Sequence, residues 1–348
     1  MATRLAYLIT EDWYFRQHFL ALAIAARDAG HDVHVMCRTG ERGPEASEAI
    51  RSEGLALREI GFARSGLNPF KDLATRRQIT EAYREMRPDI VHHVALKPII
   101  HGQAAARDAG IRARVNMLPG FGHVFTADTV KARILRPLVS RALAAALAGE
   151  QVGIAVMNRD DQAQIASLAK VGASCVTVLP GTGVDLDRYE PSPEPSGTPV
   201  VTYLGRFLRD KGLRDLVEAG RLLRQRGIQV VIRLVGAPDP SNPASIDPAE
   251  IDVWRRENFI DIRPWTDDVS SVWRESHLAV LPSYREGFGM SLAEAAACGR
   301  VRRNCVAHPL RFGDRKAPVL RCGGRKASVP ISYPGPRSVQ LRQAGVGR

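Results

Sequence analysis

Apolar and polar positions follow two different periods along most of the chain, which separates predicted strands from predicted helices. Short runs that are mostly apolar, such as RLAYLI at residues 4–9, are typical of buried β-strands. Longer segments with a helical period lie between them, and a glycine ends the one at residues 15–30. The predicted strands of this part are residues 4–9, 31–37, 89–95, 113–118 and 152–158, and the predicted helices are residues 15–30, 74–86, 100–109 and 129–148.

The same alternation starts again after residue 172. A proline-rich connection, EPSPEPSGTP, which cannot hold a helix, precedes the next strand. The predicted strands here are residues 200–205, 230–236, 259–264 and 277–283, and the predicted helices are residues 213–225 and 271–276. Strands that alternate with helices pair in parallel and carry helices on both faces of the sheet. We therefore predict an α/β chain of two Rossmann-like, doubly wound domains, residues 1–172 and 173–299.

Composition favours a globular protein of the reducing cytoplasm. Of the 348 residues, 45% are hydrophobic and 25% are charged, and no apolar run approaches the ~20 residues that span a bilayer. The start, MATRLAYLITEDW, lacks the long apolar stretch of a signal peptide. The five cysteines have neither metal-binding nor redox spacing. We expect a cytoplasmic protein.

The net positive charge of the chain lies almost entirely in its last part. Residues 300–348 hold twelve Lys or Arg and one acid, Asp314, out of totals of 49 and 37, which leaves 37 basic and 36 acidic residues in 1–299. A nucleic-acid- or anion-binding protein that uses this tail is one alternative function. The nearly neutral body argues against nucleic acid as a partner.

The tail itself departs from the alternating pattern. It has no glutamate, five prolines and no sustained period, which predicts disorder. One hypothesis is a frameshift or broken gene end, which would truncate the second domain and leave an inactive protein. The other is a natural truncation that elements from elsewhere complete.

Ligands of doubly wound sheets bind at the carboxyl ends of the strands, so polar and charged residues at these ends are candidates for a binding site. In GRFLRDKG, Gly205 ends a strand, Arg206 follows it, and Lys211 precedes a helix. Two cations near a helix start form a suitable cradle for a diphosphate. Trp265, in RPWTDD after another strand, either lines a base pocket or packs in the core.

The most distinctive stretch is REGFGMSLAEAAACG, with Glu286 and Glu294 on either side of a glycine turn. Gly287 and Gly289 allow backbone N–H groups to approach a ligand. A carboxylate only accepts hydrogen bonds, which suits paired hydroxyls such as those of a ribose. The alternative is that both glutamates lie on a solvated surface.

Together and at this spacing, GRFLRDKG, VLPGTGVD and the E-x7-E pattern resemble the family 4 retaining glycosyltransferases. The resemblance extends over residues 1–299 and implies the GT-B fold, in which two Rossmann-like domains face each other across a cleft. It implies that Glu286 contacts the donor sugar, Glu294 the nucleotide ribose, and Arg206 with Lys211 the diphosphate. It also implies backbone contacts from residues 287–289, which include Phe288.

The first domain resembles the subgroup that extends polyprenyl-diphosphate-linked oligosaccharides, usually from UDP-N-acetylhexosamines or related UDP sugars. The motifs are SGLNPFKD, HHVALKPIIHGQAAARDAGI and NMLPGFGHVF. The family's glycine-rich first loop and its later His-Gly are replaced by TEDWYF and LPGFG. The first-domain residue that touches the reacting sugar is therefore not identified. The histidines at positions 18 and 123 each have either a structural or a catalytic role. The acceptor-side candidates are His18, Lys97, His101, Gly120, Gly122, His123 and the loop at residues 10–15.

Residues 129–148 predict a basic amphipathic helix. Lys131, Arg133, Arg136 and Arg141 are interspersed with apolar residues. Such a helix either packs one apolar face on its own sheet or lies on an anionic membrane at the inner face of the envelope. A lipid-linked acceptor favours the second role.

The expected reaction moves a hexose or N-acetylhexosamine from a nucleotide sugar to a lipid-linked or surface-polysaccharide acceptor. Arg206 and Lys211 stabilise the departing diphosphate, and no DxD motif lies at these strand ends, so we expect neither a metal nor another cofactor. The resemblance also implies that a phosphate oxygen takes the acceptor's proton and that Glu286 positions the donor. A glycosidase would also use two carboxylates but has no need of the two cations. A nicotinamide dehydrogenase would place G-x-G-x-x-G where TEDWYF stands.

Overall fold

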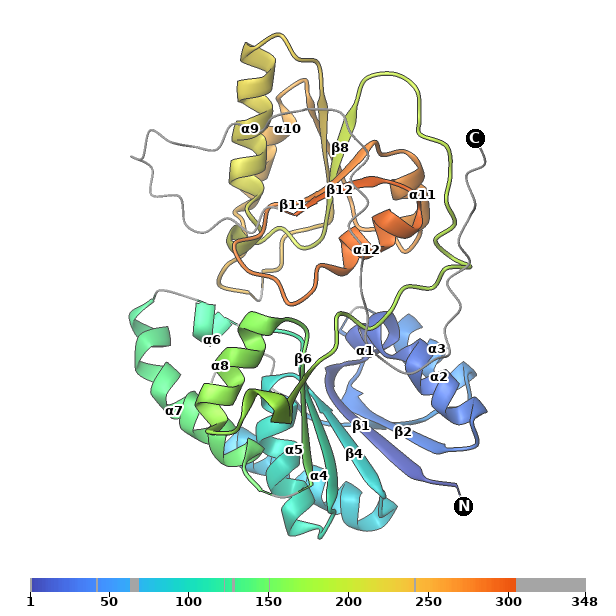
Figure 1. Ribbon diagram of the computed structural model, residues 1–348, viewed down its shortest axis with the longest axis vertical. Helices are drawn as coiled ribbons and strands as arrows, with labels where there is room; N and C mark the ends of the chain where they lie inside the picture. The colour runs from blue at the N-terminus through green and yellow to red at the C-terminus, as the bar shows by residue number, and fades with distance from the viewer. Residues whose placement is uncertain are drawn as a thin grey trace. The chain divides into compact units, whose positions relative to one another are not determined.

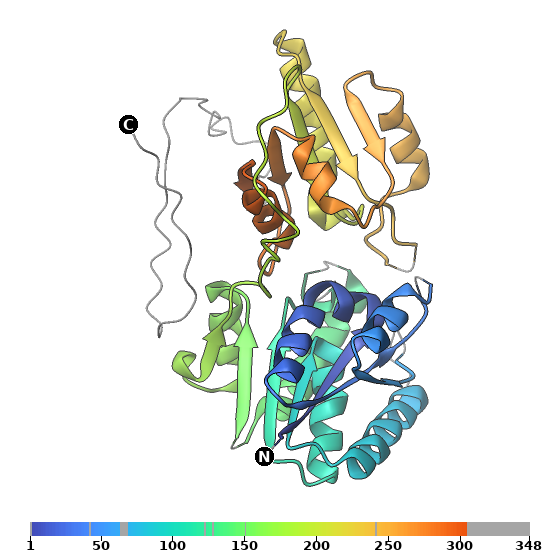
Figure 2. The same cartoon turned by 90° about the vertical axis from the view of Figure 1, so that its right-hand side faces the viewer.

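The computed structural model describes residues 2–41, 43–62, 69–121, 123–126, 129–149, 151–240 and 242–304. It contains two parallel β-sheets with helices on both faces, as predicted (Figures 1 and 2). Both sheets belong to one compact unit of the chain.

The first sheet has seven parallel strands in the order β3-β2-β1-β4-β5-β6-β7. Its strands are β1 (Arg4–Glu11), β2 (Asp32–Arg38), β3 (Ala56–Glu59), β4 (Ile90–Val94), β5 (Ala113–Leu118), β6 (Val152–Val156) and β7 (Val176–Val178). Its helices are α1 (Asp12–His18), α2 (Leu20–Asp28), α3 (Glu45–Ser52), α4 (Pro69–Met86), α5 (Leu96–Asp108), α6 (His123–Thr126), α7 (Val130–Leu147) and α8 (Arg159–Ala169), with a short 3₁₀ helix at Ala173–Cys175. Leu5 of β1 aligns with Val33 of β2 on one side and with Ile90 of β4 on the other.

The central strand β1 shows why the run RLAYLI is apolar at successive positions. Side chains alternate across a strand, so a strand covered on both faces needs apolar residues at every position. Tyr7 and Ile9 pack in one core with Phe15 of α1. Ala6 and Leu8 pack in the core on the other face with residues of α4, including Ile79.

The second sheet has five parallel strands in the order β10-β9-β8-β11-β12. Its strands are β8 (Val200–Leu204), β9 (Val231–Val235), β10 (Ile260–Arg263), β11 (Leu278–Leu281) and β12 (Val301–Asn304). Its helices are the 3₁₀ turn η2 (Arg209–Lys211), α9 (Leu213–Gln225), α10 (Pro248–Arg255), α11 (Val269–Arg274) and α12 (Met290–Ala297). The core of this sheet includes Tyr203, Ile232 and the fully buried Trp273.

Two predicted boundaries need correction. β7 pairs with β6 of the first sheet, so that sheet extends beyond the boundary predicted at residue 172. β12 lies in the segment predicted to be a disordered tail, and its residues pair in parallel with β11, as in Leu278 with Val301. For residues 301–304 the prediction of disorder is therefore wrong, because pairing with a neighbouring strand stabilises a segment whose composition alone does not predict a strand. Residues 305–348 lie outside the described part of the chain, and so does their predicted disorder.

The loop predicted at residues 10–15 is not a loop. β1 continues to Glu11 and α1 begins at Asp12, whose buried carboxylate fixes the turn between them. That carboxylate accepts hydrogen bonds from the Ser47 hydroxyl at 2.6 Å and from the Gly40 backbone N–H at 2.9 Å. The helix predicted at 15–30 is likewise divided at Phe19 into α1 and α2.

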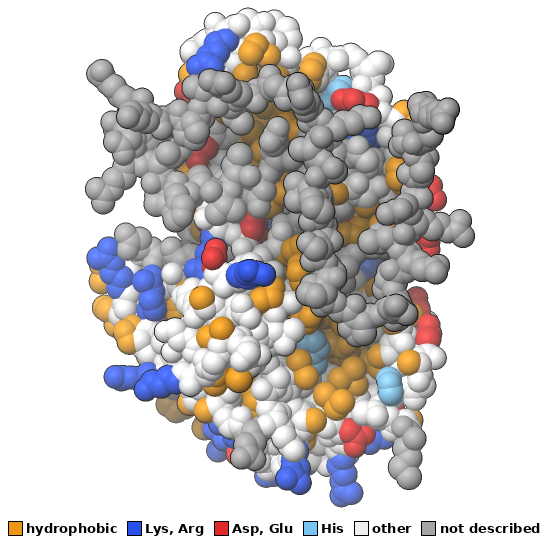
Figure 3. Space-filling view, in the orientation of Figure 1, with side chains coloured by type: hydrophobic (Ala, Val, Ile, Leu, Met, Phe, Trp, Pro, Cys, Tyr) orange, Lys and Arg blue, Asp and Glu red, His pale blue; other side chains and the backbone are white. Residues whose placement is uncertain are grey.

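The predicted basic helix is observed as α7, and it has both an apolar buried face and an apolar exposed face. Ala132, Val139 and Leu143 are buried in the first domain's core. Val130, Ile134 and Leu138 are exposed by 73%, 70% and 60%. Basic and hydrophobic side chains mix on the edge of the surface where α7 lies (Figure 3). No described helix is both long enough and apolar enough to cross a membrane.

Candidate functional site

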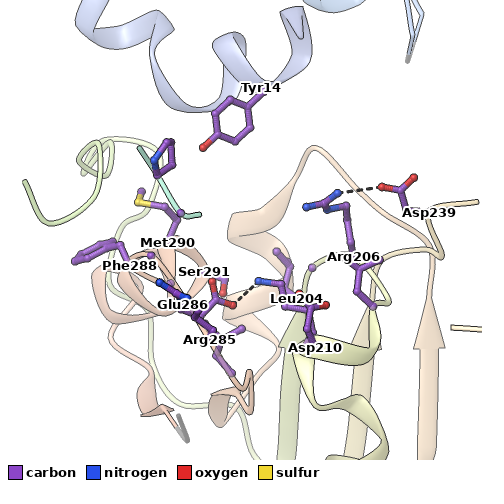
Figure 4. A pocket seen from close by; sticks show the side chains of 18 of the residues that line it. Tyr14, Leu204, Arg206, Asp210, Asp239, Arg285, Glu286, Phe288, Met290 and Ser291 are labelled. Carbon is purple, nitrogen blue, oxygen red and sulfur yellow. Dashed lines mark hydrogen bonds and ion pairs between the residues drawn. The ribbon is translucent and has the colours of Figure 1, made fainter. Parts of the chain in front are cut away.

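A cavity of about 1080 Å³ lies at the carboxyl ends of strands from both sheets. Its walls come from the loops that follow β8, β9 and β11, together with α1 and the segment after β5. This volume is at the upper end of the range for sites that hold drug-sized ligands. Figure 4 shows its lining from close by.

Lys211 and Glu286 form an ion pair at the floor of this cavity. Lys211 Nζ donates to Glu286 Oε1 at 2.5 Å, and the Ser283 hydroxyl donates to the same oxygen at 2.6 Å. Both charged side chains are largely buried, so the attraction is stronger than it would be in water. Two of the residues singled out from sequence are therefore in direct contact, although they follow different strands.

Gly212 explains how the two loops come so close. It has a φ of +71°, which side-chain-bearing residues rarely adopt, and it lies between η2 and α9. A Cβ atom at this position would lie 2.1 Å from the carbonyl oxygen of Pro282. Only glycine allows the start of α9 to pack against the loop that carries Glu286, and this packing sets the position of Lys211.

Arg206 also has an acidic partner. It leaves the end of β8, and its Nη1 donates to Asp239 Oδ2 at 3.0 Å (Figure 4). The Asp239 side chain is only 8% exposed, whereas that of Arg206 is 43% exposed and lines the cavity. The predicted cradle therefore presents its two cations already neutralised, each by a carboxylate.

Glu294 lies in α12 and is buried against the cavity rather than on a solvated surface, so the alternative of a solvated glutamate is wrong here. It is 8% exposed, and burial raises the pKa of its carboxyl to about 7, while Tyr189 and Arg188 act in the opposite direction. Its protonation state therefore changes near neutral pH.

The remaining predicted donor-side residues also line the cavity. They are Gly205, Gly287, Phe288, Gly289 and Trp265. Trp265 is 37% exposed, so it forms part of the wall and is not a core residue. Gly289 immediately precedes α12, whose N-terminus faces this cavity through Met290 and Ser291.

The first sheet contributes an aromatic wall. Trp13, Tyr14 and His18 of α1 line the cavity, as does Gly120 after β5. Burial raises the pKa of Tyr14 to about 12, with the positive charge of Arg206 acting against it. Burial lowers the pKa of His18 to about 4, so this ring is neutral at pH 7. The rings of Tyr14 and His18 lie 4.4 Å apart.

Four acceptor-side candidates are not placed in this wall. Lys97 and His101 belong to α5 and are not among the residues that line the cavity. His101 Nε2 instead lies 3.7 Å from Asp72 Oδ1, and burial lowers the pKa of both Lys97 and His101. Gly122 and the side chain of His123 lie outside the described part of the chain.

The described residues contain no group of three or more His, Cys, Asp or Glu side chains that could hold a metal ion. Among the described residues, the Lys and Arg side chains that line the cavity are those of Arg206, Lys211 and Arg285, and each of them is paired with a carboxylate, that of Arg285 being Asp161.

Two protein-family models match the chain. The model of the glycosyl transferases group 1 matches residues 198–310, and the glycosyl transferase 4-like model matches residues 4–148. Together the matches span the second sheet and most of the first. The chain is a glycosyltransferase.

A curated relative of this glycosyltransferase is the N,N'-diacetylbacillosaminyl-diphospho-undecaprenol alpha-1,3-N-acetylgalactosaminyltransferase of Campylobacter jejuni. The two are 24% identical over 271 residues, which are 74% of this chain and 69% of the relative.

Solved structures share the GT-B fold. The sucrose-phosphate synthase of Thermosynechococcus elongatus superposes with a TM-score of 0.67 at 18% identity, over 87% of this chain and 81% of that one. Anabaena HepE, in complex with UDP and glucose, gives a TM-score of 0.65 at 16% identity, over 86% and 80% of the two chains.

Several residues of the glycosyltransferase site were not predicted from the sequence. Asp239 and Ser283 are partners of predicted residues, and Tyr14 lies in a segment that was singled out only as a loop. Asp239 belongs to the stretch APDP, directly after a strand, where a polar residue reaches the ligand edge of the sheet. That position is the signal that would have found it.

Proposed function

We propose that this glycosyltransferase moves a hexose or N-acetylhexosamine from a UDP sugar to a polyprenyl-diphosphate-linked acceptor, with retention of the anomeric configuration. The observation that carries the proposal is the convergence of Arg206, Lys211, Glu286 and Glu294 on one cavity. Two cations suit a diphosphate, and two carboxylates suit sugar hydroxyls.

The diphosphate would bind by competing for cations that are already paired. Its negative charges take hydrogen bonds from Arg206 and Lys211, which now donate to Asp239 and Glu286. In the transition state the bond between the anomeric carbon and the β-phosphate oxygen breaks, and negative charge grows on the diphosphate. The two fixed cations stabilise that charge without the need for solvent to rearrange.

The acceptor hydroxyl oxygen forms the new bond to the anomeric carbon on the face that the diphosphate leaves. Its proton passes to an oxygen of that diphosphate, so atoms and charges balance. Glu286, held by Lys211 and Ser283, would hydrogen-bond the donor sugar and position it. Glu294 would hold the ribose hydroxyls, and no covalent sugar–enzyme intermediate is required.

The choice of UDP and of the acceptor rests on relatives. Anabaena HepE, which shares the fold, was solved with UDP and glucose, and the Campylobacter relative is named for a diphospho-undecaprenol acceptor. Trp265 at the cavity wall offers a surface on which a flat base can stack. We also propose transfer without a metal, because Arg206 and Lys211 supply the positive charge.

We further propose that the enzyme contacts an anionic membrane through the exposed face of α7. Val130, Ile134 and Leu138 are exposed there, and Arg141 is exposed on the same helix. Apolar side chains that enter the lipid boundary, with basic residues beside them, bind anionic surfaces. The sheet-packed face of α7 is compatible with this role, since it uses other residues.

A transfer assay tests the proposal. Purified protein is mixed with each of several UDP-hexoses and UDP-N-acetylhexosamines and a short-chain polyprenyl-diphosphate-linked sugar, with EDTA present. We expect UDP release with one donor class and an α-linked product from an α-linked donor. A product of inverted configuration, or turnover that depends entirely on added metal, would contradict the mechanism.

A further inference from the structure

The loop that carries Glu286 is held from the first sheet as well as from the second. Asn158 follows β6 and forms the N-cap of α8, where its Oδ1 accepts a hydrogen bond from the Asp161 backbone N–H at 2.7 Å. Its Nδ2 donates to the backbone carbonyl oxygens of Glu286 and Gly287 at 3.2 and 2.8 Å. One side chain thus caps a helix of the first sheet and binds the backbone of the donor loop.

Arg285, the residue before Glu286, makes a second connection. Its Nη2 donates to Asp161 Oδ1 at 2.7 Å and to Gln164 Oε1 at 2.8 Å. Its guanidinium lies 4.9 Å from the centre of the Phe121 ring, within the range of a cation–π contact. The Asp161 side chain is only 2% exposed, so this ion pair is well shielded on its acidic side.

Gly287 shows how closely the loop approaches the first sheet. A Cβ atom at this position would lie 1.9 Å from the carbonyl oxygen of Pro119, which follows β5. The glycine predicted to open the backbone toward a ligand therefore also permits contact with the first sheet.

These contacts involve the residues directly before and after Glu286. Its neighbours on both sides are bound by the first sheet, while its own carboxylate is bound by Lys211 and Ser283. A shift of the loop away from Asn158 would move the Glu286 carboxylate relative to Lys211. Transfer requires reacting groups to be held within a fraction of an ångström, so such a shift would slow it.

We propose that Asn158, Asp161 and Arg285 form a clasp that positions Glu286 for sugar transfer. They are positioning residues that act through the loop backbone, and this inference rests on the proposed function. The clasp makes the geometry of the donor site depend on contact with the acceptor-side sheet.

Three variants and one control test the clasp. Asn158→Asp keeps the capping oxygen but replaces the N–H donor by a second oxygen, which repels the carbonyls of residues 286 and 287 and also the Asp161 carboxylate, to which Nδ2 donates at 3.1 Å. Arg285→Met removes the ion pair at similar length, and Arg285→Lys restores its charge. Arg159→Met is the matched control, because Arg159 is exposed in the first turn of the same helix, next to Asn158.

The first readout is hydrogen exchange of the backbone amides of residues 283–290, with those of β8 as an internal reference. It needs no ligand and does not depend on the proposed function. We expect faster exchange in that loop for Asn158→Asp and Arg285→Met, with β8 and the control unchanged. Unchanged exchange in both variants would overturn the clasp.

The second readout separates positioning from binding. We expect kcat for UDP-sugar turnover to fall about ten-fold or more in the two variants, with partial recovery in Arg285→Lys, while the Kd for UDP stays within about three-fold. An equal loss in kcat and in UDP affinity would refute a positioning role. If the wild type neither binds UDP nor turns over any UDP sugar, the proposed function fails, and the exchange comparison alone decides the clasp.

Discussion

Lys211 and Glu286 are 75 positions apart in sequence, and Nζ of the first donates to Oε1 of the second at 2.5 Å. This pair holds the Lys211 ammonium at the cavity, where the proposed function places the diphosphate. The partners of Lys211 would change on donor binding, from a carboxylate to a phosphate.

Replacing Lys211 by Met should weaken UDP binding and slow transfer. The variant loses a charge-assisted hydrogen bond to the diphosphate, worth roughly 1.5–3 kcal/mol, which corresponds to about 10- to 100-fold in affinity. It also leaves the Glu286 carboxylate without its cation. Calorimetric titration with UDP measures the loss. Uridine, which has no phosphate, should bind the variant and the wild type equally, and an equal loss for uridine would contradict the assignment.

Replacing Arg206 by Met should also mainly weaken the binding of the diphosphate. Arg206 is 43% exposed at the cavity, but its partner Asp239 is only 8% exposed, so the variant leaves a buried carboxylate without this cation and the unfolding midpoint should fall as well. The affinity of the variant for UDP should fall more than its affinity for UMP. Its affinity for UDP should also depend less on the salt concentration. Arg256→Met, at an exposed position after α10, is the control. Equal losses for UDP and UMP would place Arg206 away from the β-phosphate.

Glu294 should make stability depend on pH. Burial raises its pKa to about 7 from an ordinary value of 4.5, so the folded protein holds this proton more tightly than the unfolded chain does. The resulting stabilisation is complete below about pH 4.5 and is lost as the pH rises through 7.

Glu294→Gln should remove this dependence. We compare the free energy of unfolding of the variant with that of the wild type. This difference should shift in favour of the variant between pH 5 and pH 8, by up to about 3 kcal/mol. Denaturant unfolding at both pH values measures the difference. UDP binding should weaken at the same time, because the ribose hydroxyls lose an acceptor. A pH-independent difference between the two proteins would show that this carboxyl does not titrate near neutrality.

The α7 surface should govern membrane binding. Ile134→Asp with Leu138→Asp adds acids to an exposed apolar face, so stability should hardly change while binding to anionic vesicles falls about ten-fold or more. Co-sedimentation with phosphatidylglycerol-containing vesicles measures it. Leu222→Asp, at an apolar position of α9 exposed by 46%, is the control. Undiminished binding of the double variant would refute the membrane role of α7.

The architecture could be predicted from the sequence because strand periodicity and buried apolar runs are local signals. RLAYLI is apolar at successive positions because both faces of β1 are covered, and this is visible without tertiary information. The helix α3 and the strand β12 were missed for the opposite reason, since their stability comes from packing and from pairing with β11. Asp12 was missed as a turn-forming residue because its partners, Gly40 and Ser47, lie beyond the next strand.

The residues predicted for the donor side could be singled out because they stand at strand ends and their spacing resembles that of a known family, and five of them beyond the charged residues line the same cavity. Their partners could not be predicted. Neither the ion pair of Arg206 with Asp239 nor the hydrogen bonds of Asn158 to the donor loop produces a periodic pattern in the sequence. Lys97 and His101 share a motif with the lipid-linked subgroup, yet they lie in α5 beside Asp72 rather than in the cavity wall. Whether they bind an acceptor stays a prediction.

The proposed function requires that one cavity holds a uridine diphosphate through Arg206, Lys211 and Glu294. The most direct measurement is calorimetric titration of the purified protein with UDP, with GDP and ADP as controls, repeated on Glu294→Ala and on Arg256→Met. We expect UDP to bind in preference to the other two, the Glu294 variant to bind it more weakly, and the Arg256 variant to bind it as the wild type does. If the folded wild-type protein does not bind UDP, or if the Glu294 variant binds it unchanged, the cavity is not a uridine diphosphate site of this kind.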